Sequence, residues 1–209
     1  MVTIYTYNLL IAKYINNKSL CNLSLVNKYW MLVTKEQRLL RHATIKEYYQ
    51  LALEGNLEGI KLLHKYKIKG CTTYAMDWAS EKGHLEVVKF LHYNRTEGCT
   101  TCAMHWASEK GHLDMVKWLH ENRTEGCTIH TMNETAKQGH LEVVKFLHYN
   151  RTEGCTTNAM DWASADGYLE VVKFLHYNRT EGCTTKAIEQ ASANGHLEIV
   201  KFLEENIKK

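Results

Sequence analysis

The sequence predicts an all-α solenoid, in which short helix–turn–helix units stack behind a small helical head at the N-terminus. A glycine recurs every 28 residues, and a leucine follows each one by two residues. Apolar residues after each glycine recur at the spacing of a helix face. The chain contains no proline, which suits short helices separated by glycine turns. The repeated glycines are Gly55, Gly83, Gly111, Gly139, Gly167 and Gly195.

This spacing divides the chain into a head, residues 1–41, and six units in residues 42–209. The last five units share one frame with local changes, whereas the first is degenerate. Two helices of about eight residues cannot bury an apolar face alone, so the units must stack. The predicted units are 42–69, 70–97, 98–125, 126–153, 154–181 and 182–209.

The first helix of a unit is predicted from its cap and its narrow apolar face. In the second unit, Thr73 precedes residues 74–80, and its hydroxyl is expected to cap the exposed amides of the first turn. Met76, Ala79 and Ser80 lie three or four residues apart, so they share one face of small and flexible side chains.

The second helix follows a glycine turn. Gly83 is predicted to end the first helix, because glycine readily adopts the left-handed conformation found just past a helix C-terminus. Residues 85–93 then form a second helix, in which Val88 and Leu91 belong to a wide apolar surface. The polar residues 94–98 make the connection to the next unit.

Composition excludes several classes of partner. The net charge is only +3, from 26 basic and 23 acidic residues, so the chain offers no basic stripe for nucleic acid. It also has no apolar run of the roughly 18 residues that a membrane span needs. The first 19 residues have no basic residue before Lys13 and no small-residue cleavage site, which argues against a secretory signal. We therefore expect no nucleic acid partner, no membrane partner and a cytoplasmic location.

The cysteines also indicate a reducing compartment. Equivalent residues of stacked units are expected about 8–10 Å apart, the spacing of packed helices. A disulfide requires Cα atoms within roughly 4.4–6.8 Å, so these residues are predicted to be free thiols. The repeated cysteines, five of the seven in the chain, are Cys71, Cys99, Cys127, Cys155 and Cys183.

Residues 74–80 and 83–89 resemble the ankyrin repeat motif, whose second half reads Gly-His-Leu-Glu-Val-Val-Lys, as residues 83–89 do. Ala75 and Asp77 replace the proline and histidine of the motif, and the unit has 28 residues instead of about 33. The resemblance covers about residues 42–209. It implies a protein-binding solenoid with shortened loops, whose concave groove is lined mainly by first helices. Compressed repeats of this type look like those of protists and large DNA viruses, which would place the protein in a host cytoplasm if it comes from a virus or parasite.

The head resembles the F-box family, in which a leucine, a valine and a tryptophan follow one another at the spacing of Leu20, Val26 and Trp30. The resemblance implies binding to the adaptor subunit of an SCF-type ubiquitin ligase. Thr3-Ile4 replaces the leucine–proline pair that opens most F-boxes, and the alternative is a plain helical cap for the stack. The apolar residues of the F-box-like head are Leu9, Ile11, Ile15, Leu20, Leu23, Val26 and Trp30.

Candidate partner-binding residues are those that vary between otherwise constant units. They lie at the fifth, eighth, ninth and twelfth residues of each unit, on the first helix. The candidates are Tyr74, Asp77, Trp78, Glu81, Cys102, His105, Trp106, Glu109, His130, Asn133, Glu134, Lys137, Asn158, Asp161, Trp162, Lys186, Glu189 and Gln190.

Three tryptophans share the ninth place, which the family uses in its groove: Trp78, Trp106 and Trp162. Tryptophans are favoured anchors at protein interfaces. The alternative is that the rings pack on one another as a structural ladder. Glu134 and Gln190 at the same place count against a purely buried role.

Catalytic and metal chemistry are not indicated. The histidines recur with the repeat, whereas a catalytic histidine needs one special environment. Cys99, Cys102 and His105 only superficially suggest zinc, because no second cysteine pair accompanies them. We therefore expect no enzyme activity and no cofactor. The sequence predicts a protein-interaction module, either as the target-recruiting subunit of an SCF-type ligase or as a plain ankyrin scaffold or inhibitor.

Overall fold

A computed structural model describes residues 45–68 and 70–207, and the structural statements below concern these residues. They form α-helices and no strand, as the sequence predicts. The helices are α3 (Ile45–Leu53), α4 (Leu57–Lys65), α5 (Thr73–Glu81), α6 (Leu85–Asn94), α7 (Thr101–Glu109), α8 (Leu113–Asn122), α9 (Ile129–Lys137), α10 (Leu141–Asn150), α11 (Thr157–Ala165), α12 (Leu169–Asn178), α13 (Thr185–Ala193) and α14 (Leu197–Ile207). The F-box-like residues of the predicted head lie outside the described residues.

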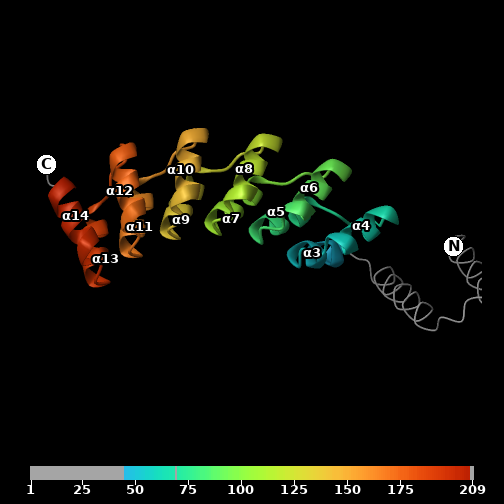
Figure 1. Ribbon diagram of the computed structural model, residues 1–209, viewed down its shortest axis with the longest axis horizontal. Helices are drawn as coiled ribbons and strands as arrows, with labels where there is room; N and C mark the ends of the chain where they lie inside the picture. The colour runs from blue at the N-terminus through green and yellow to red at the C-terminus, as the bar shows by residue number, and fades with distance from the viewer. Residues whose placement is uncertain (1–44, 69, 208–209) are drawn as a thin grey trace, which may run out of the picture. The chain divides into compact units, whose positions relative to one another are not determined.

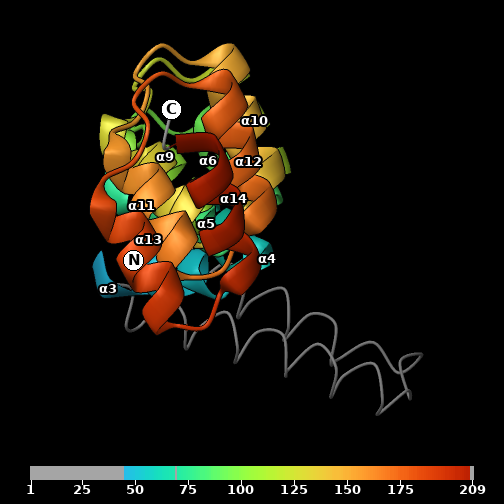
Figure 2. The same ribbon diagram turned by 90° about the vertical axis from the view of Figure 1, so that its left-hand side faces the viewer.

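The helices form two rows. The first helices, with odd labels, lie along one side of the stack and the second helices, with even labels, along the other (Figure 1). Each first helix packs against the next first helix and against the second helix of its own unit. Figure 2 shows the same two rows from the end that holds α13 and α14. One helix pair thus falls within each predicted unit.

A threonine holds the N-terminal cap position of the first helices from α5 to α13, and this threonine lies one residue earlier than predicted. Thr73 is the first residue of α5, and the cap position of this helix is held by Thr72, whose side chain makes no capping hydrogen bond. At the same place in the next unit, Thr100 caps α7. Its hydroxyl accepts a hydrogen bond from the backbone N–H of Cys102 at 3.1 Å. Thr156 and Thr184 cap α11 and α13 in the same way. The expected cap at Thr73 was therefore wrong by one position, since either threonine of the pair satisfies the sequence pattern.

The core lies between the two rows. In the second unit Ala75, Met76 and Ala79 of α5 are buried against Val88 and Leu91 of α6. The equivalent places of the other units are also largely buried, although Thr131 and Thr135 replace the two alanines in the fourth unit. Burying a valine- or leucine-sized side chain contributes about 1.5–3 kcal/mol, so the stack gains stability from each unit. The predicted apolar faces of both helices are confirmed.

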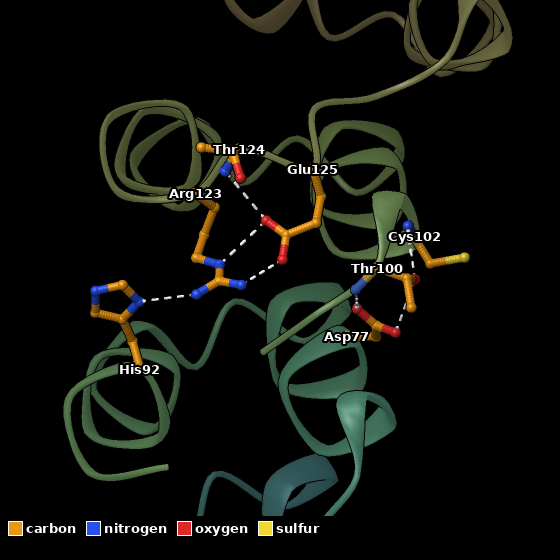
Figure 3. A network of polar contacts seen from close by, with 7 residues as sticks. All are labelled: Asp77, His92, Thr100, Cys102, Arg123, Thr124 and Glu125. Carbon is orange, nitrogen blue, oxygen red and sulfur yellow. Dashed lines mark hydrogen bonds and ion pairs between the residues drawn. The ribbon is translucent and has the colours of Figure 1, made fainter. Parts of the chain in front are cut away.

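The connections between units are held by a repeated arginine–glutamate pair. Arg123 forms a two-pronged ion pair with Glu125, and its third nitrogen lies 3.4 Å from Nδ1 of His92 in the preceding unit (Figure 3). Arg95, Arg151 and Arg179 form the same pairs with Glu97, Glu153 and Glu181. The shortened loop is thereby tied both to itself and to its neighbour.

The repeated cysteines lie at the start of units two to six and are free. Cys71, Cys99 and Cys155 are buried, while Cys127 and Cys183 are half-buried. Burial, followed by the negative charge of Glu125, raises the pKa of the Cys99 thiol to about 12. These groups are therefore protonated at neutral pH, and the prediction of free thiols is confirmed for the described cysteines. Cys21 lies outside the described residues.

Candidate partner-binding face

The first helices expose one side to solvent, because their other side packs on the second row. We call this surface the first-helix face and define it by the fifth, ninth and twelfth residues of units two to six. At the fifth place the side chain of Tyr74 is 54% exposed, and Cys102 is half-buried. His130, Asn158 and Lys186 are exposed at the same place. This place therefore presents a different accessible side chain in each unit.

The eighth place requires a correction, because most of its side chains are buried between units. Asp77 is fully buried, and its carboxylate accepts from the backbone N–H of Thr100 at 2.8 Å and from the Thr100 hydroxyl at 2.9 Å (Figure 3). Burial raises the pKa of Asp77, and the Thr100 hydrogen bonds oppose this shift. Asp161 bonds to Thr184 in the same way, at 2.8 and 2.7 Å. These carboxylates tie adjacent units together and are not available to a partner.

The remaining residues at the eighth place follow the same pattern in part. Asn133 is fully buried, accepts from the Thr156 backbone N–H at 2.9 Å and donates to its hydroxyl at 3.0 Å. His105 is half-buried, with Nδ1 3.2 Å from the Thr131 hydroxyl. Only Glu189, in the last unit, is exposed. Variation at this place thus reflects alternative ways of bonding the next unit's first helix.

At the ninth place the two sequence-based alternatives for the tryptophans are each partly supported. The Trp78 and Trp106 rings meet edge to face, with centroids 6.4 Å apart, so adjacent units do contact through them. Yet Trp78 remains 39% exposed, and Trp106 and Trp162 are half-buried. The rings form a row on the surface of the stack without being enclosed in its core.

The ninth place changes character in the fourth unit. Glu134 is half-buried and forms an ion pair with Lys137 at 3.6 Å. The Lys137 ammonium also lies over the Trp162 ring, 5.5 Å from its centroid. Gln190 in the last unit is exposed. The aromatic surface of α5 and α7 therefore gives way to a mixed polar surface on α9 and α11.

The twelfth place carries carboxylates in the aromatic part of the face. Glu81 pairs with the adjacent Lys82 at 2.9 Å, and Glu109 with Lys110 at 2.8 Å. The glutamate side chains are 21% and 24% exposed, whereas the lysines are 44% and 46% exposed. The negative groups are thus held against the helices, and their positive partners extend into solvent.

One aromatic residue next to the first-helix face is not among the predicted residues: Tyr49, at the eighth place of the first unit. Tyr49 of α3 meets Tyr74 edge to face, with centroids 6.1 Å apart, and its hydroxyl lies 3.3 Å from that of Thr72. The aromatic row therefore begins in the first unit. Tyr49 was overlooked because the first unit is degenerate and offered no constant frame against which variation could be read.

The repeated histidines act within the stack. The His112 ring lies against Gly83, and its Nε2 is 3.0 Å from the Glu81 carbonyl oxygen. His84 makes the equivalent contact with Leu53. Within the described ranges no cluster of three or more histidine, cysteine or acidic side chains is arranged to hold a metal ion, and this includes the region of Cys99. Nor is any helix of residues 45–207 that the structure describes both long and apolar enough to span a bilayer.

Comparison with known protein families agrees with this architecture. The family described as ankyrin repeats in many copies matches residues 76–120 and 104–148, and the family of ankyrin repeats in three copies matches residues 132–209. The matches span the second to sixth units and do not include residues 1–41. A search of curated proteins found no match.

Proposed function

This chain belongs to the ankyrin repeat family, a family of protein–protein interaction modules, and we propose that it binds its partner through the first-helix face. The proposal is one of binding and not of catalysis, as is typical of ankyrin repeat proteins. It assigns the partner-contacting role to the fifth, ninth and twelfth places and leaves the eighth place to the stack.

One observation carries the proposal: large aromatic side chains lie accessible at positions that vary between otherwise constant units. Tyr74 is 54% and Trp78 is 39% exposed on helices whose buried positions hardly change from unit to unit. Aromatic side chains of this size lose much apolar contact with water when a partner covers them, and they are enriched among the residues that dominate interface energies. Because the residue at an exposed place differs between units, each unit can offer a partner a different side chain.

A photo-cross-linking experiment tests which row meets the partner. A benzoylphenylalanine is placed at Tyr74 on the first-helix face or at Tyr93 on the second-helix row, where the native side chain is 70% exposed. Both sites are exposed tyrosines, and the control site is the more exposed of the two, so low accessibility cannot explain a missing adduct at Tyr93. We expect Tyr74 to give a discrete protein adduct in cells and Tyr93 to give none. Adducts from Tyr93 alone would place the binding surface on the other row.

A finer proposal concerns the head. The spacing of Leu20, Val26 and Trp30 supports an F-box-like segment, which would make the chain the target-recruiting subunit of an SCF-type ubiquitin ligase. In that arrangement the head binds the ligase adaptor while the first-helix face holds the target. The alternative is a plain ankyrin scaffold or inhibitor in which residues 1–41 have no link to ubiquitin.

Titration of the purified protein with the ligase adaptor subunit separates these alternatives. For an F-box, the wild type binds and a variant with Leu20→Ala and Val26→Ala does not, because both changes remove apolar contacts. Removing a buried leucine side chain costs about 2–5 kcal/mol, so a circular dichroism spectrum must show that the variant is still folded. A folded wild type that does not bind the adaptor leaves the scaffold alternative.

A further inference from the structure

Between the fourth and fifth units, the chain's own Lys137 places a positive charge over a tryptophan ring. The Lys137 ammonium lies over the Trp162 ring at 5.5 Å and pairs with the Glu134 carboxylate at 3.6 Å. An ammonium over an indole is attracted by the negative face of the ring, and a carboxylate beside it adds to this attraction. A tryptophan at the ninth place, with a carboxylate nearby, therefore favours a positive charge over its ring.

The second and third units have the same tryptophan but not the cation. Trp106 occupies the place of Trp162, and Glu81 occupies the place of Lys137, 56 residues earlier in each case. A carboxylate cannot take the role of the ammonium, because the ring face repels negative charge. The α5–α7 part of the face thus combines accessible indoles with a carboxylate, while α9–α11 supplies its own lysine.

The carboxylates of this part are only weakly neutralised. Glu81 and Glu109 pair with the neighbouring residues Lys82 and Lys110, whose side chains are close to half exposed. Ion pairs of this exposed kind contribute little, typically below about 1 kcal/mol. An incoming cation that also meets an indole can therefore displace the lysines.

From this comparison of units we propose that the α5–α7 part of the first-helix face binds an arginine or lysine side chain of the partner, seated over the Trp106 ring beside Trp78 and paired with Glu81. The inference rests on the proposed function and adds the chemistry of the partner: a segment with a basic residue flanked by apolar ones. The basic residue matches the carboxylate, and the apolar neighbours cover Tyr74 and the indoles.

Two matched peptides test the inference directly. The purified full chain is titrated with acetyl-Leu-Arg-Leu-amide and with the same peptide carrying citrulline, which keeps the shape of arginine without its charge. The indole N–H signals of the tryptophans are followed by NMR and assigned with single Trp→Phe variants. We expect the arginine peptide to shift the Trp78 and Trp106 signals and to leave Trp118 and Trp162 in place. Equal shifts with citrulline, or none at Trp78 and Trp106, overturn the inference.

Substitutions then exchange the two parts of the face. Glu81→Lys supplies an internal cation as Lys137 does, and we expect it to abolish the response at Trp106. Lys137→Glu removes the internal cation, so Trp162 should gain a response to the arginine peptide. Lys82→Ala should strengthen binding about two- to fivefold, because it removes a competing charge. A control variant, Glu86→Gln on the second-helix row, should bind like the wild type. Unchanged responses in the first two variants contradict the proposed seat.

The outcome is separable from that of the proposed function. If cross-linking at Tyr74 captures a partner but the arginine and citrulline peptides shift the indole signals equally, the face binds protein. In that case the inference that it binds a basic side chain is rejected. If Tyr74 captures no partner while the arginine peptide shifts both indoles, the cation seat stands and the proposed function is rejected.

Discussion

Asp161 shows how a single buried residue links two units. Its carboxylate accepts from both the backbone N–H and the hydroxyl of Thr184, and Asn133 makes comparable bonds to Thr156 one unit earlier. The natural exchange of aspartate for asparagine at this place is possible because the threonine hydroxyl can donate or accept. Asp77, Asn133 and Asp161 thus each link their unit to the cap threonine of the next one through a part-buried polar bridge.

Replacement of Asp161 by Ala should therefore destabilise the protein by about 1–3 kcal/mol, because the Thr184 amide loses its partner. Asp161→Asn is the matched control and should cost much less, since asparagine already serves at residue 133. Urea unfolding curves of both variants measure the difference. Equal losses for the two would show that the bridge contributes nothing specific.

The partner-facing role expected for Asp77, Asn133 and Asp161 at the eighth place was wrong for a physical reason, because all three are buried between units. A place that varies between units is often an exposed contact. Here, however, aspartate, asparagine and histidine can all form a hydrogen bond to a threonine of the next unit, so a buried polar bridge also tolerates different residues. The burial of this place depends on how closely the next unit approaches, which a pattern within one unit does not show. The fifth place, by contrast, is accessible in most units as expected.

At the scale of the element, each first helix ends in a turn that only glycine fits well. Gly111 has a φ of +75°, and a Cβ there would lie 2.6 Å from Nδ1 of His140 in the next unit. Gly195 has a φ of +80°, but a Cβ there would meet nothing within 4 Å. A side chain at Gly195 would therefore meet only backbone strain, whereas one at Gly111 would meet backbone strain and a clash with the neighbouring unit.

We expect Gly195→Ala to cost roughly 1–2 kcal/mol for the left-handed backbone alone. Gly111→Ala should cost about 1–3 kcal/mol more, because the His140 ring must also move. Thermal unfolding of the two variants tests this order. If both lose the same stability, the histidine contact does not restrict the turn.

The loop glutamates make the stability of the stack depend on pH in the acidic range. Burial tends to raise the pKa of Glu153, but hydrogen bonds from the Arg151 side chain and from backbone amides outweigh it and lower the pKa to about 2 from its ordinary 4.5. A carboxylate with a depressed pKa stabilises the fold above its ordinary value, and this contribution is lost as the pH falls from about 4.5 towards 2.

The unfolding free energies of the wild type and Glu153→Gln should therefore differ most near neutral pH. The gap between them is expected to narrow as the pH falls through this window, because the wild-type glutamate becomes neutral as well. The other loop glutamates titrate in both proteins and cancel from the comparison. A gap that stays constant down to pH 2.5 would mean that the Arg151–Glu153 pair adds no stability.

For the whole molecule, the repeat explains why so much of the fold could be predicted from sequence. Helices, glycine turns and the apolar faces recur in each unit, so local pattern determines them several times over. Contacts between units could not be predicted in the same way. The edge-to-face contact of Trp78 with Trp106, the position of Lys137 over Trp162 and the contact of Arg123 with His92 of the preceding unit depend on the distance between neighbouring units. Binding, on this view, arises from differences between units placed on a common frame.

Affinity and stability measured on one variant, Trp106→Ala, bear most directly on the proposed binding face. For a partner captured through Tyr74, we expect binding to weaken by about 2 kcal/mol or more, the mark of an interface anchor. The unfolding free energy should fall by less than the roughly 3–5 kcal/mol lost on truncating a buried tryptophan, because the ring is only half-buried. Trp118→Ala, on the second-helix row, should leave affinity unchanged. A loss of 3–5 kcal/mol in stability with unchanged affinity would contradict the account and make the tryptophans a structural ladder.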